Sequence, residues 1–189
     1  MTLPQPPVVA LRPATATDFD HISALFAALH GFNAALDARF ILAANWHQSL
    51  HAQFRQSWDA PEALWLLAWA DAVPVGLLML AEHHDPPLFH ERCWVELVAL
   101  YVAPTRRRGG LAYRLLEAAR AWTAARGLDR LQLYVTASNA TAKAFYQRCG
   151  LVPVQEIWRL EVTPTATTPH PVAPALQANS ASPPERPHP

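Results

Sequence analysis

The chain has 189 residues, of which 51% are hydrophobic and 16% charged, enough for one domain with an apolar core. Its 15 basic and 15 acidic side chains cancel, so the composition favours neither a nucleic-acid-binding nor a membrane-binding protein. The two cysteines, Cys93 and Cys149, make no disulfide framework, and no export signal or long apolar run is visible. We therefore expect a cytoplasmic protein.

Helical and strand-like apolar patterns alternate along the chain, which predicts a mixed α/β (α+β) fold. The expected strands are Val8–Pro13, a hairpin within 63–84 that turns at Asp71 and Ala72, Arg92–Val102, Leu131–Val135, and a last pair in 151–154 and 156–162. The expected helices run from Thr17 or Asp18 to Gly31, over 43–58, from Leu111 to Gly127, and from Ser138 or Asn139 to Cys149. This order predicts a mostly antiparallel sheet of about six or seven strands with about four helices.

The two ends of the chain differ from the middle in composition. Residues 1–7 are predicted to be a flexible arm, and residues 8–162 the folded domain. The proline-rich stretch 163–189 contains no aromatic residue and is predicted to be a disordered tail. A proline-rich docking ligand is the less favoured reading of that tail.

The stretch YVAPTRRRGGLAYRLL, residues 101–116, joins a strand to a helix through a basic, glycine-rich turn. The first N–H groups of a helix have no partner inside it, so such a turn can bind a phosphate. Gly109 and Gly110 allow a close approach, and Arg106–Arg108 add positive charge. The alternative is a solvated basic turn. No P-loop or dinucleotide-binding glycine motif is present.

Two segments resemble signatures of the GNAT superfamily of N-acetyltransferases. Residues 102–116 are similar to its acetyl-CoA signature, with Arg107, Gly110 and Ala112 at the matching positions. Residues 139–151, NATAKAFYQRCGL, are similar to its second signature, with leucine in place of the usual final phenylalanine. The resemblance implies the GNAT fold, with acetyl-CoA as the cosubstrate and no metal.

The resemblance also implies where the coenzyme binds. The pyrophosphate would lie on the N–H groups of Arg107 to Ala112, and the pantetheine in a splayed gap between the strand ending at Val102 and the strand 131–135. Asn139 would bond the pantetheine arm, cap its helix, or do both. The expected coenzyme-binding residues are Leu100, Val102, Arg107, Arg108, Gly109, Gly110, Leu111, Ala112 and Asn139.

Two residues are expected to act as acid and base. Glu96 is the only carboxylate between Arg92 and Val102 and lies among apolar residues. Its position also resembles that of the glutamate base in the histone-acetylating branch of the family. Its alternatives are a solvent-facing carboxylate or a ligand for the substrate's cation. Tyr146 matches the family's tyrosine that protonates the departing thiolate, and its alternative is helix packing beside Phe145.

These observations predict an N-acetyltransferase that acts by direct transfer on a primary amine, favoured to be that of a small molecule. The alternatives are a protein lysine or N-terminal acetyltransferase, and a non-catalytic acyl-CoA sensor or docking module. No nucleic-acid or membrane partner is expected, and the choice between monomer and homodimer is open. The spacing of His83, His84, His90 and Cys93 matches no known zinc pattern, so a solvated turn is favoured there over a metal site.

Overall fold

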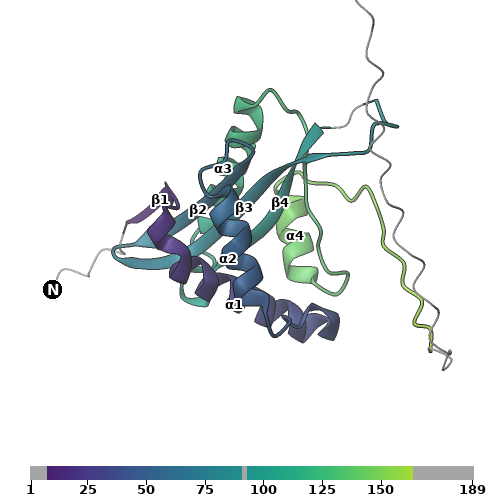
Figure 1. Ribbon diagram of the computed structural model, residues 1–189, viewed down its shortest axis with the longest axis horizontal. Coiled ribbons are helices and arrows are strands. Elements are labelled where there is room, and N and C mark those ends of the chain that lie inside the picture. Colours follow the sequence, from purple (N-terminus) through teal and green to yellow (C-terminus); the bar gives the residue numbers. More distant parts are fainter. Residues whose placement is uncertain (1–7, 91–92, 164–189) are drawn as a thin grey trace, which may run out of the picture. The chain divides into compact units, whose positions relative to one another are not determined.

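The computed structural model describes residues 8–90 and 93–163. The predicted arm and all of the predicted tail after Thr163 lie outside these residues. The chain divides into two compact units, Met1–Val152 and Pro153–Pro189. The helices and strands of the described residues all belong to the first unit (Figure 1).

A single five-stranded sheet forms the centre of the first unit, with its strands in chain order. Neighbouring strands from β1 to β4 are antiparallel, whereas β5 runs parallel to β4 (Figure 1). The strands are β1 (Val9–Pro13), β2 (Ala63–Ala70), β3 (Val73–His84), β4 (Cys93–Val102) and β5 (Leu131–Gln132). The predicted mixed, mostly antiparallel sheet is therefore confirmed, with fewer strands than expected.

The last predicted strand pair, in 151–154 and 156–162, is wrong. Residues 153–163 contain no helix or strand, and β5 ends at Gln132 instead of Val135. The apolar side chains that resembled a strand pattern stay exposed, at 82% for Ile157, 87% for Trp158 and 85% for Leu160. A strand is stabilised by hydrogen bonds to a neighbouring strand, and the described part of this segment makes no such ladder.

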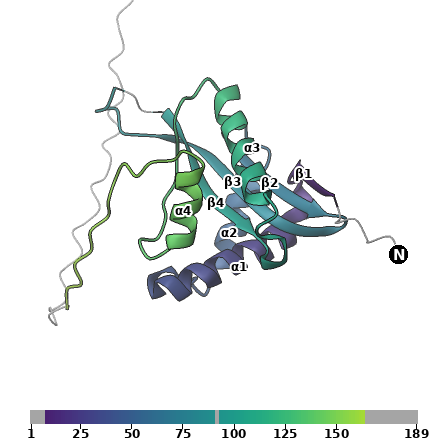
Figure 2. The ribbon, with the colours of Figure 1, turned by 180° about the vertical axis from the view of Figure 1, so that it is seen from behind.

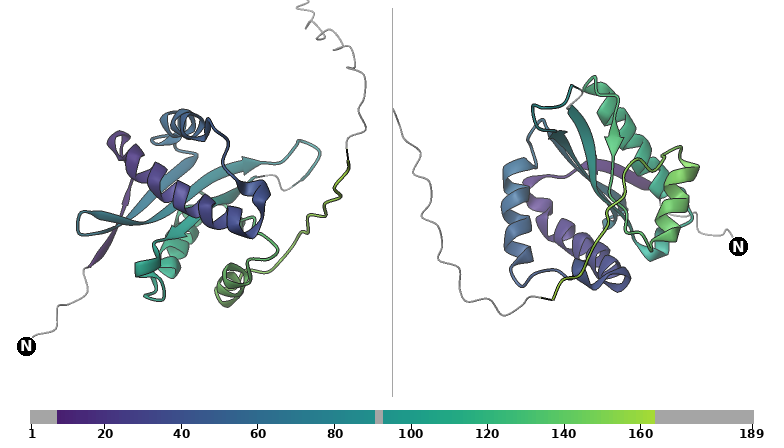
Figure 3. Two further views of the ribbon diagram at one scale, coloured as in Figure 1. Left: turned by 90° about the horizontal axis from the view of Figure 1, so that it is seen from below. Right: turned by 90° about the vertical axis from the view of Figure 1, so that its right-hand side faces the viewer.

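Within the described part of the chain, four α-helices cover the two faces of the sheet (Figures 2 and 3). They are α1 (Phe19–Leu36), α2 (Trp46–Ser57), α3 (Leu111–Ala125) and α4 (Ala140–Arg148), with short 3-10 turns η1 (Ala16–Asp18), η2 (Ala38–Phe40) and η3 (Pro104–Arg106). The predicted end of the first helix at Gly31 is wrong, because α1 continues to Leu36. A glycine inside a helix costs only about 1 kcal/mol, which packing can offset.

Each face of the sheet carries its own core. Ile22 of α1 and Phe54 of α2 pack with Leu67 and Leu77 on one face. On the other face, α3 packs against a separate cluster, and Phe145 and Cys149 lie at its margin. Because both faces are covered, β2 and β3 are apolar at nearly every position instead of alternating.

The start of α1 is held by a buried carboxylate. Asp18 accepts hydrogen bonds from the backbone N–H and the hydroxyl of Thr15, both at 2.8 Å, and Arg12 lies 3.7 Å away. Burial by itself would raise the pKa of Asp18, but the bonds from Thr15 and the Arg12 charge together lower it below the ordinary 3.8. A carboxyl group whose pKa is lower in the folded than in the unfolded state stabilises the fold at pH values above its unfolded-state pKa. This stabilisation is lost as the pH falls through its folded-state pKa.

Asp18→Asn is therefore expected to lower the free energy of unfolding by about 1–2 kcal/mol at pH 7. The reason is that a neutral amide oxygen accepts the two bonds from Thr15 more weakly than the charged carboxylate does. The difference from the unmodified protein should shrink below pH 4, where Asp18 itself becomes protonated. Urea unfolding at pH 7 and pH 3 measures both values. Asp59→Asn, at an exposed position after α2, is the control and should change stability by less than about 0.5 kcal/mol. An equal loss at both pH values would contradict the role of the charge.

Candidate functional site

A bulge interrupts β4 halfway along its length. Met79 pairs with Ala99, but the next residue of β3, Leu80, pairs with Leu97, so Val98 is an extra residue in β4. Its side chain is 41% exposed, although it belongs to a central strand. Bulges of this kind bend a strand and redirect the residues on either side, and they often lie next to binding sites.

Beyond the bulge, one edge of β4 is open. β4 pairs with β3 along its whole length, but with β5 only where Val95 and Glu96 lie beside Leu131 and Gln132. The N–H of Ala103 donates to a carbonyl on the β3 side, so the carbonyl of Val102, in the same peptide, points to the open side. A gap between β4 and β5 therefore begins beyond Glu96 and Gln132, and it leaves the β4 edge at Leu100 unpaired with β5, while the carbonyl oxygen of Val102 accepts from Arg107.

The turn between β4 and α3 exposes a row of backbone donors. Arg108 and Gly110 both have positive φ, 64° and 77°, and α3 begins at the next residue, Leu111. The N–H groups of Leu111 and Ala112 have no acceptor within the helix. Among the described residues, no backbone hydrogen bond outside helices and strands is donated by residues 108–110. Successive N–H groups in this geometry form a concave anion site, which the helix dipole strengthens.

A pocket of about 370 Å³ lies against this turn and carries a concentration of positive charge. Its lining includes three arginines, Arg106, Arg107 and Arg114. The chain has zero net charge, so an anion site needs a local concentration of positive charge. The three arginines give this pocket such a concentration. Its donors and arginines fit the pyrophosphate of a coenzyme A molecule.

Arg107 connects this pocket to the open edge of β4. Its Nε donates to the carbonyl oxygen of Val102 at 3.1 Å, and its guanidinium lies 5.9 Å from the ring of Phe32 and 6.0 Å from that of Tyr101. The side chain of Arg107 thus braces the end of β4, while its backbone belongs to the anion-binding turn. Arg106 is half-buried and Arg108 exposed.

Sequence reasoning missed three residues of the pocket, Val9, Thr105 and Arg114. The Nη2 of Arg114 donates to the carbonyl oxygen of Val9 at 2.9 Å, which fixes β1 beside the start of α3. The two residues are 105 positions apart, so no local pattern relates them. The only available signal was an arginine one helical turn after Gly110.

Glu96 lies on the same strand, before the bulge. It is opposite Ala81 of β3 and beside Gln132 of β5, and it is half-buried. Its neighbours Val95 and Leu97 pack into the core on the α3 side. Because side chains alternate along a strand, Glu96 belongs to the opposite face, which α1 and α2 cover.

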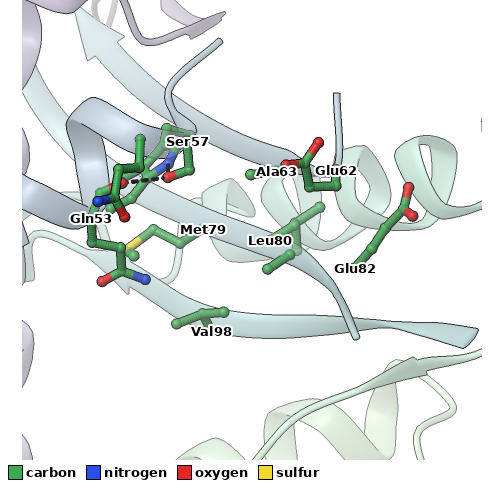
Figure 4. Close-up of a pocket in the computed structure, with 11 residues that line it drawn as sticks. Gln53, Ser57, Glu62, Ala63, Met79, Leu80, Glu82 and Val98 are labelled. Atoms are coloured by element: carbon green, nitrogen blue, oxygen red, sulfur yellow. Dashed lines mark hydrogen bonds between the residues drawn. The ribbon is translucent and has the colours of Figure 1, made fainter. Parts of the chain in front are cut away.

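A second pocket opens on that same face, between α2 and the strands (Figure 4). Its volume is about 170 Å³, and the extra residue of the β4 bulge forms part of its wall. The Ser57 hydroxyl is already bonded, since it donates to Gln53 and accepts from Trp65. Polar residues Gln53, Gln56, Ser57 and Glu62 meet apolar residues Met79 and Val98 in its lining.

The two remaining predicted residues belong to α4. Asn139 caps this helix, its Oδ1 accepting from the N–H of Ala142 at 3.0 Å, so the capping role is confirmed. Burial raises the pKa of Tyr146 to about 12, with a smaller contribution from Cys149. Among the described residues no hydrogen bond joins Tyr146 to Glu96, so any joint action requires a ligand between β4 and α4.

No helix among the described residues has the length and apolar character to cross a membrane.

A model of the acetyltransferase (GNAT) family matches residues 29–151. Two mycothiol acetyltransferases are also similar. The one from Clavibacter michiganensis subsp. michiganensis (strain NCPPB 382) is 45% identical over 81 residues, which is 40% of this chain. The one from Beutenbergia cavernae is 31% identical over 107 residues, which is 57% of this chain.

These matches cover only 26% and 34% of the two relatives, so the chain spans about a third or less of their length. Among solved structures, aminoglycoside N-acetyltransferase AAC(6')-Iy in complex with CoA has a TM-score of 0.69 at 18% identity, over 85% of this chain and 99% of that one. This likeness shows a shared fold. The family model covers more than half of the chain and includes β4, the arginine-glycine turn and α4. The chain therefore belongs to the GNAT acetyltransferase family.

Proposed function

We propose that this protein transfers the acetyl group of acetyl-CoA to a primary amine of a small molecule, directly and without a covalent enzyme intermediate. The observation that carries the proposal is the cationic donor turn at the end of the open β4 edge. A ligand with a phosphate at one end and an extended amide-bearing arm at the other would use both features. Acetyl-CoA has this shape and chemistry.

In the proposed complex, the turn from Arg107 to Ala112 binds the pyrophosphate through backbone N–H groups. The pantetheine arm then lies along the β4 edge at Leu100 and Val102. The thioester is thereby directed toward the bulge, where a strand N–H can stabilise the negative charge that develops on its oxygen. Asn139 belongs to the helix on the other side of the gap and is the proposed second partner of the arm.

A base is needed because an alkyl ammonium with a pKa near 10.4 is only about one part in a thousand neutral at about pH 7.4, which adds roughly 4 kcal/mol to the barrier. Glu96 is the proposed base, acting on an amine that approaches from the α1–α2 face. It stands two residues before the bulge on the strand that holds the thioester. The pocket in Figure 4 lies on the same face, and we propose that it receives part of the acceptor.

Tyr146 is the proposed donor of the proton that the departing thiolate takes up. With a pKa of about 12, its phenol remains protonated throughout the physiological range. A free thiol has a pKa of about 8.5, so the transfer is less balanced than an ordinary tyrosine would make it. In the proposed complex, however, the thiolate leaves in the same surroundings as the phenol. Apolar surroundings raise the pKa of a thiol, which narrows the difference between the pKa of the thiol and that of Tyr146.

The relatives support a small acceptor, because both kinds, mycothiol and aminoglycoside acetyltransferases, are named for small molecules. The test is release of coenzyme A from acetyl-CoA, followed by chromatography, with a panel of small amines, lysine peptides and peptide N-termini. Release with small amines supports the proposal, and release with peptides alone would replace it with protein acetylation. Coenzyme binding without release for any amine would leave the sensor module as the function.

Tyr146→Phe is expected to lower kcat by about 100-fold, the low end of the range for a positioned proton donor, with coenzyme affinity unchanged. The unmodified enzyme should show no loss of kcat between pH 8 and pH 10 from this group, because a pKa of about 12 keeps the phenol protonated there. Steady-state kinetics at saturating acetyl-CoA measure both effects. Tyr113→Phe, whose side chain is 51% exposed on α3, is the control and should keep the full kcat. A kcat unchanged by Tyr146→Phe would leave the tyrosine a packing role.

A further inference from the structure

Three side chains that bind metals in many proteins converge where β3 ends and β4 begins. Glu82 and His84 are two residues apart on β3, so they lie on the same face of the sheet. Cys93 is the direct partner of His84 across the ladder. The ligand atoms of Glu82, His84 and Cys93 all lie within 4.8 Å of one another.

Their spacing is close to what one tetrahedral ion requires. With Zn–S near 2.3 Å and Zn–N near 2.0–2.1 Å, the sulfur and nitrogen ligands of a tetrahedral zinc are about 3.5 Å apart. The Nε2 of His84 and the Sγ of Cys93 are 3.9 Å apart without a metal. His84 is exposed and Cys93 half-buried, so small side-chain rotations can bring them to that distance.

The carboxylate of Glu82 is already oriented by a neighbour. Arg126, at the end of α3, donates its Nε to one Glu82 oxygen at 3.0 Å, and the Arg126 guanidinium stacks 3.4 Å from the ring of Trp122. A carboxylate has a second oxygen that can bind a metal while the first keeps its hydrogen bond. The charge of Arg126 opposes a cation, whereas one thiolate and one carboxylate together balance a divalent ion.

We propose that Glu82, His84 and Cys93 form a Zn²⁺ site that joins the end of β3 to the start of β4. A thiolate with an imidazole and a carboxylate selects Zn²⁺ over Mg²⁺ or Ca²⁺, and water would complete the tetrahedron. The ion would hold the last residue of β3 beside the first residue of β4. The three ligand residues lie on the face that α3 covers, whereas the proposed base Glu96 lies on the other. Glu82 also lines the pocket of Figure 4, so the ion would hold one wall of that pocket, and its proposed role is structural.

The set differs from the one that the sequence brought to attention. His83 is on the opposite face, where its ring lies 4.4 Å from that of Trp94 and its Nε2 3.6 Å from Asp85. Spacing along the chain therefore grouped His83 with His84, although the strand separates them. Glu82 did not enter that grouping, because its place beside Cys93 depends on the register of two strands.

Cobalt serves as the spectroscopic probe, because a Co²⁺–thiolate bond gives a charge-transfer band and tetrahedral Co²⁺ gives intense visible bands. The reduced, tag-free full-length protein, first treated with a chelator, is titrated with Co²⁺ and then with Zn²⁺. We expect both features at one Co²⁺ per chain and their loss when Zn²⁺ displaces the cobalt. Cys93→Ser should abolish the charge-transfer band, and His84→Ala should weaken Co²⁺ binding at least about tenfold.

Two variants serve as matched controls. Cys149→Ser removes the chain's other cysteine, which lies at the end of α4, and His83→Ala removes the histidine on the opposite face. Both should keep the bands and the affinity of the unmodified protein. Far-ultraviolet circular dichroism confirms that each variant is folded. Absence of a band at one equivalent, or its persistence in Cys93→Ser, would overturn the proposal, and neither result bears on coenzyme A release.

Discussion

Gly110→Val is expected to abolish coenzyme A binding, with an affinity loss of about 100-fold or more. Gly110 immediately precedes α3 and has a φ of 77°, in the left-handed region. A Cβ added at this position meets no protein atom within 4 Å, so the space beside it is open and not part of the core. A valine there would fill the space in which the phosphate approaches the backbone donors. Loss of two charge-assisted hydrogen bonds at about 1.5–3 kcal/mol each accounts for the expected factor.

Backbone strain must be separated from loss of the ligand site. The left-handed region costs a non-glycine residue about 1–2 kcal/mol, and a β-branched residue more. Gly127, just beyond the other end of α3, has a φ of 69° and likewise no atom within 4 Å of an added Cβ. Gly127→Val therefore carries similar strain without touching the pocket. It should lower the melting temperature as Gly110→Val does, and keep its coenzyme affinity in isothermal titration calorimetry. Unchanged affinity in Gly110→Val would remove the phosphate-site assignment.

The local parts of this fold were accessible from the sequence because they depend on short-range chemistry. The glycine turn before a helix was predicted from the sequence of residues 101–116, and Gly110 in it has positive φ, as do Gly127 and Gly150 after the ends of α3 and α4. The hairpin turn at Asp71 was predicted from one polar dip between apolar runs, and it has a φ of 54°. Each of these signals is contained within a few residues.

The errors share a different cause, which is competition between local pattern and tertiary contact. Gly31 is a common helix terminator, yet α1 continues past it to Leu36, while its core contacts, such as those of Phe26 and Leu29, lie before Gly31. Trp158 and Leu160 belong to a segment whose apolar residues are typical of a strand, yet both side chains are exposed. A strand forms only where the edge of a neighbouring strand is available for its hydrogen bonds. The composition of a segment indicates whether it favours a helix or a strand. It does not indicate whether a neighbouring strand is available to pair with it.

In the candidate site, too, features formed by consecutive residues could be predicted, and features formed by distant residues could not. The turn at Arg107–Ala112 could be predicted because strand, turn and helix are consecutive. The bond from Arg114 to Val9 could not be predicted, because it depends on how α3 lies beside β1. The approach of Glu82 to Cys93 could not be predicted either, because it depends on the pairing of β3 with β4. The bulge at Val98 was equally hidden, because an extra residue in β4 is defined only by the register of β3. That bulge follows Glu96 by two residues, just beyond the point where β5 stops pairing with β4, so the proposed chemistry lies beside a feature that the sequence does not display.

Glu96→Gln is expected to lower kcat about 1,000-fold at pH 7 with little change in coenzyme affinity, as removal of a positioned general base does. If Glu96 takes the proton from a bound ammonium, the variant can use only amine that is already neutral. The neutral fraction rises about tenfold per pH unit up to the amine's pKa near 10.4, so the deficit should shrink steadily as pH increases. A carboxylate that only binds the substrate's cation would behave differently, since its loss would raise KM and leave kcat nearly unchanged.

The measurement is kcat and KM for one amine from pH 6.5 to pH 9.5, at saturating acetyl-CoA, for the unmodified enzyme and Glu96→Gln. A second amine of lower pKa provides the control, because more of it is neutral at pH 7 and the variant's deficit should be correspondingly smaller. Glu96 is half-buried, and glutamine has nearly the same volume, so the fold should be retained. A deficit that is constant with pH and equal for both amines would exclude Glu96 as the base. The amine would then have to lose its proton to water or to another group on the α1–α2 face.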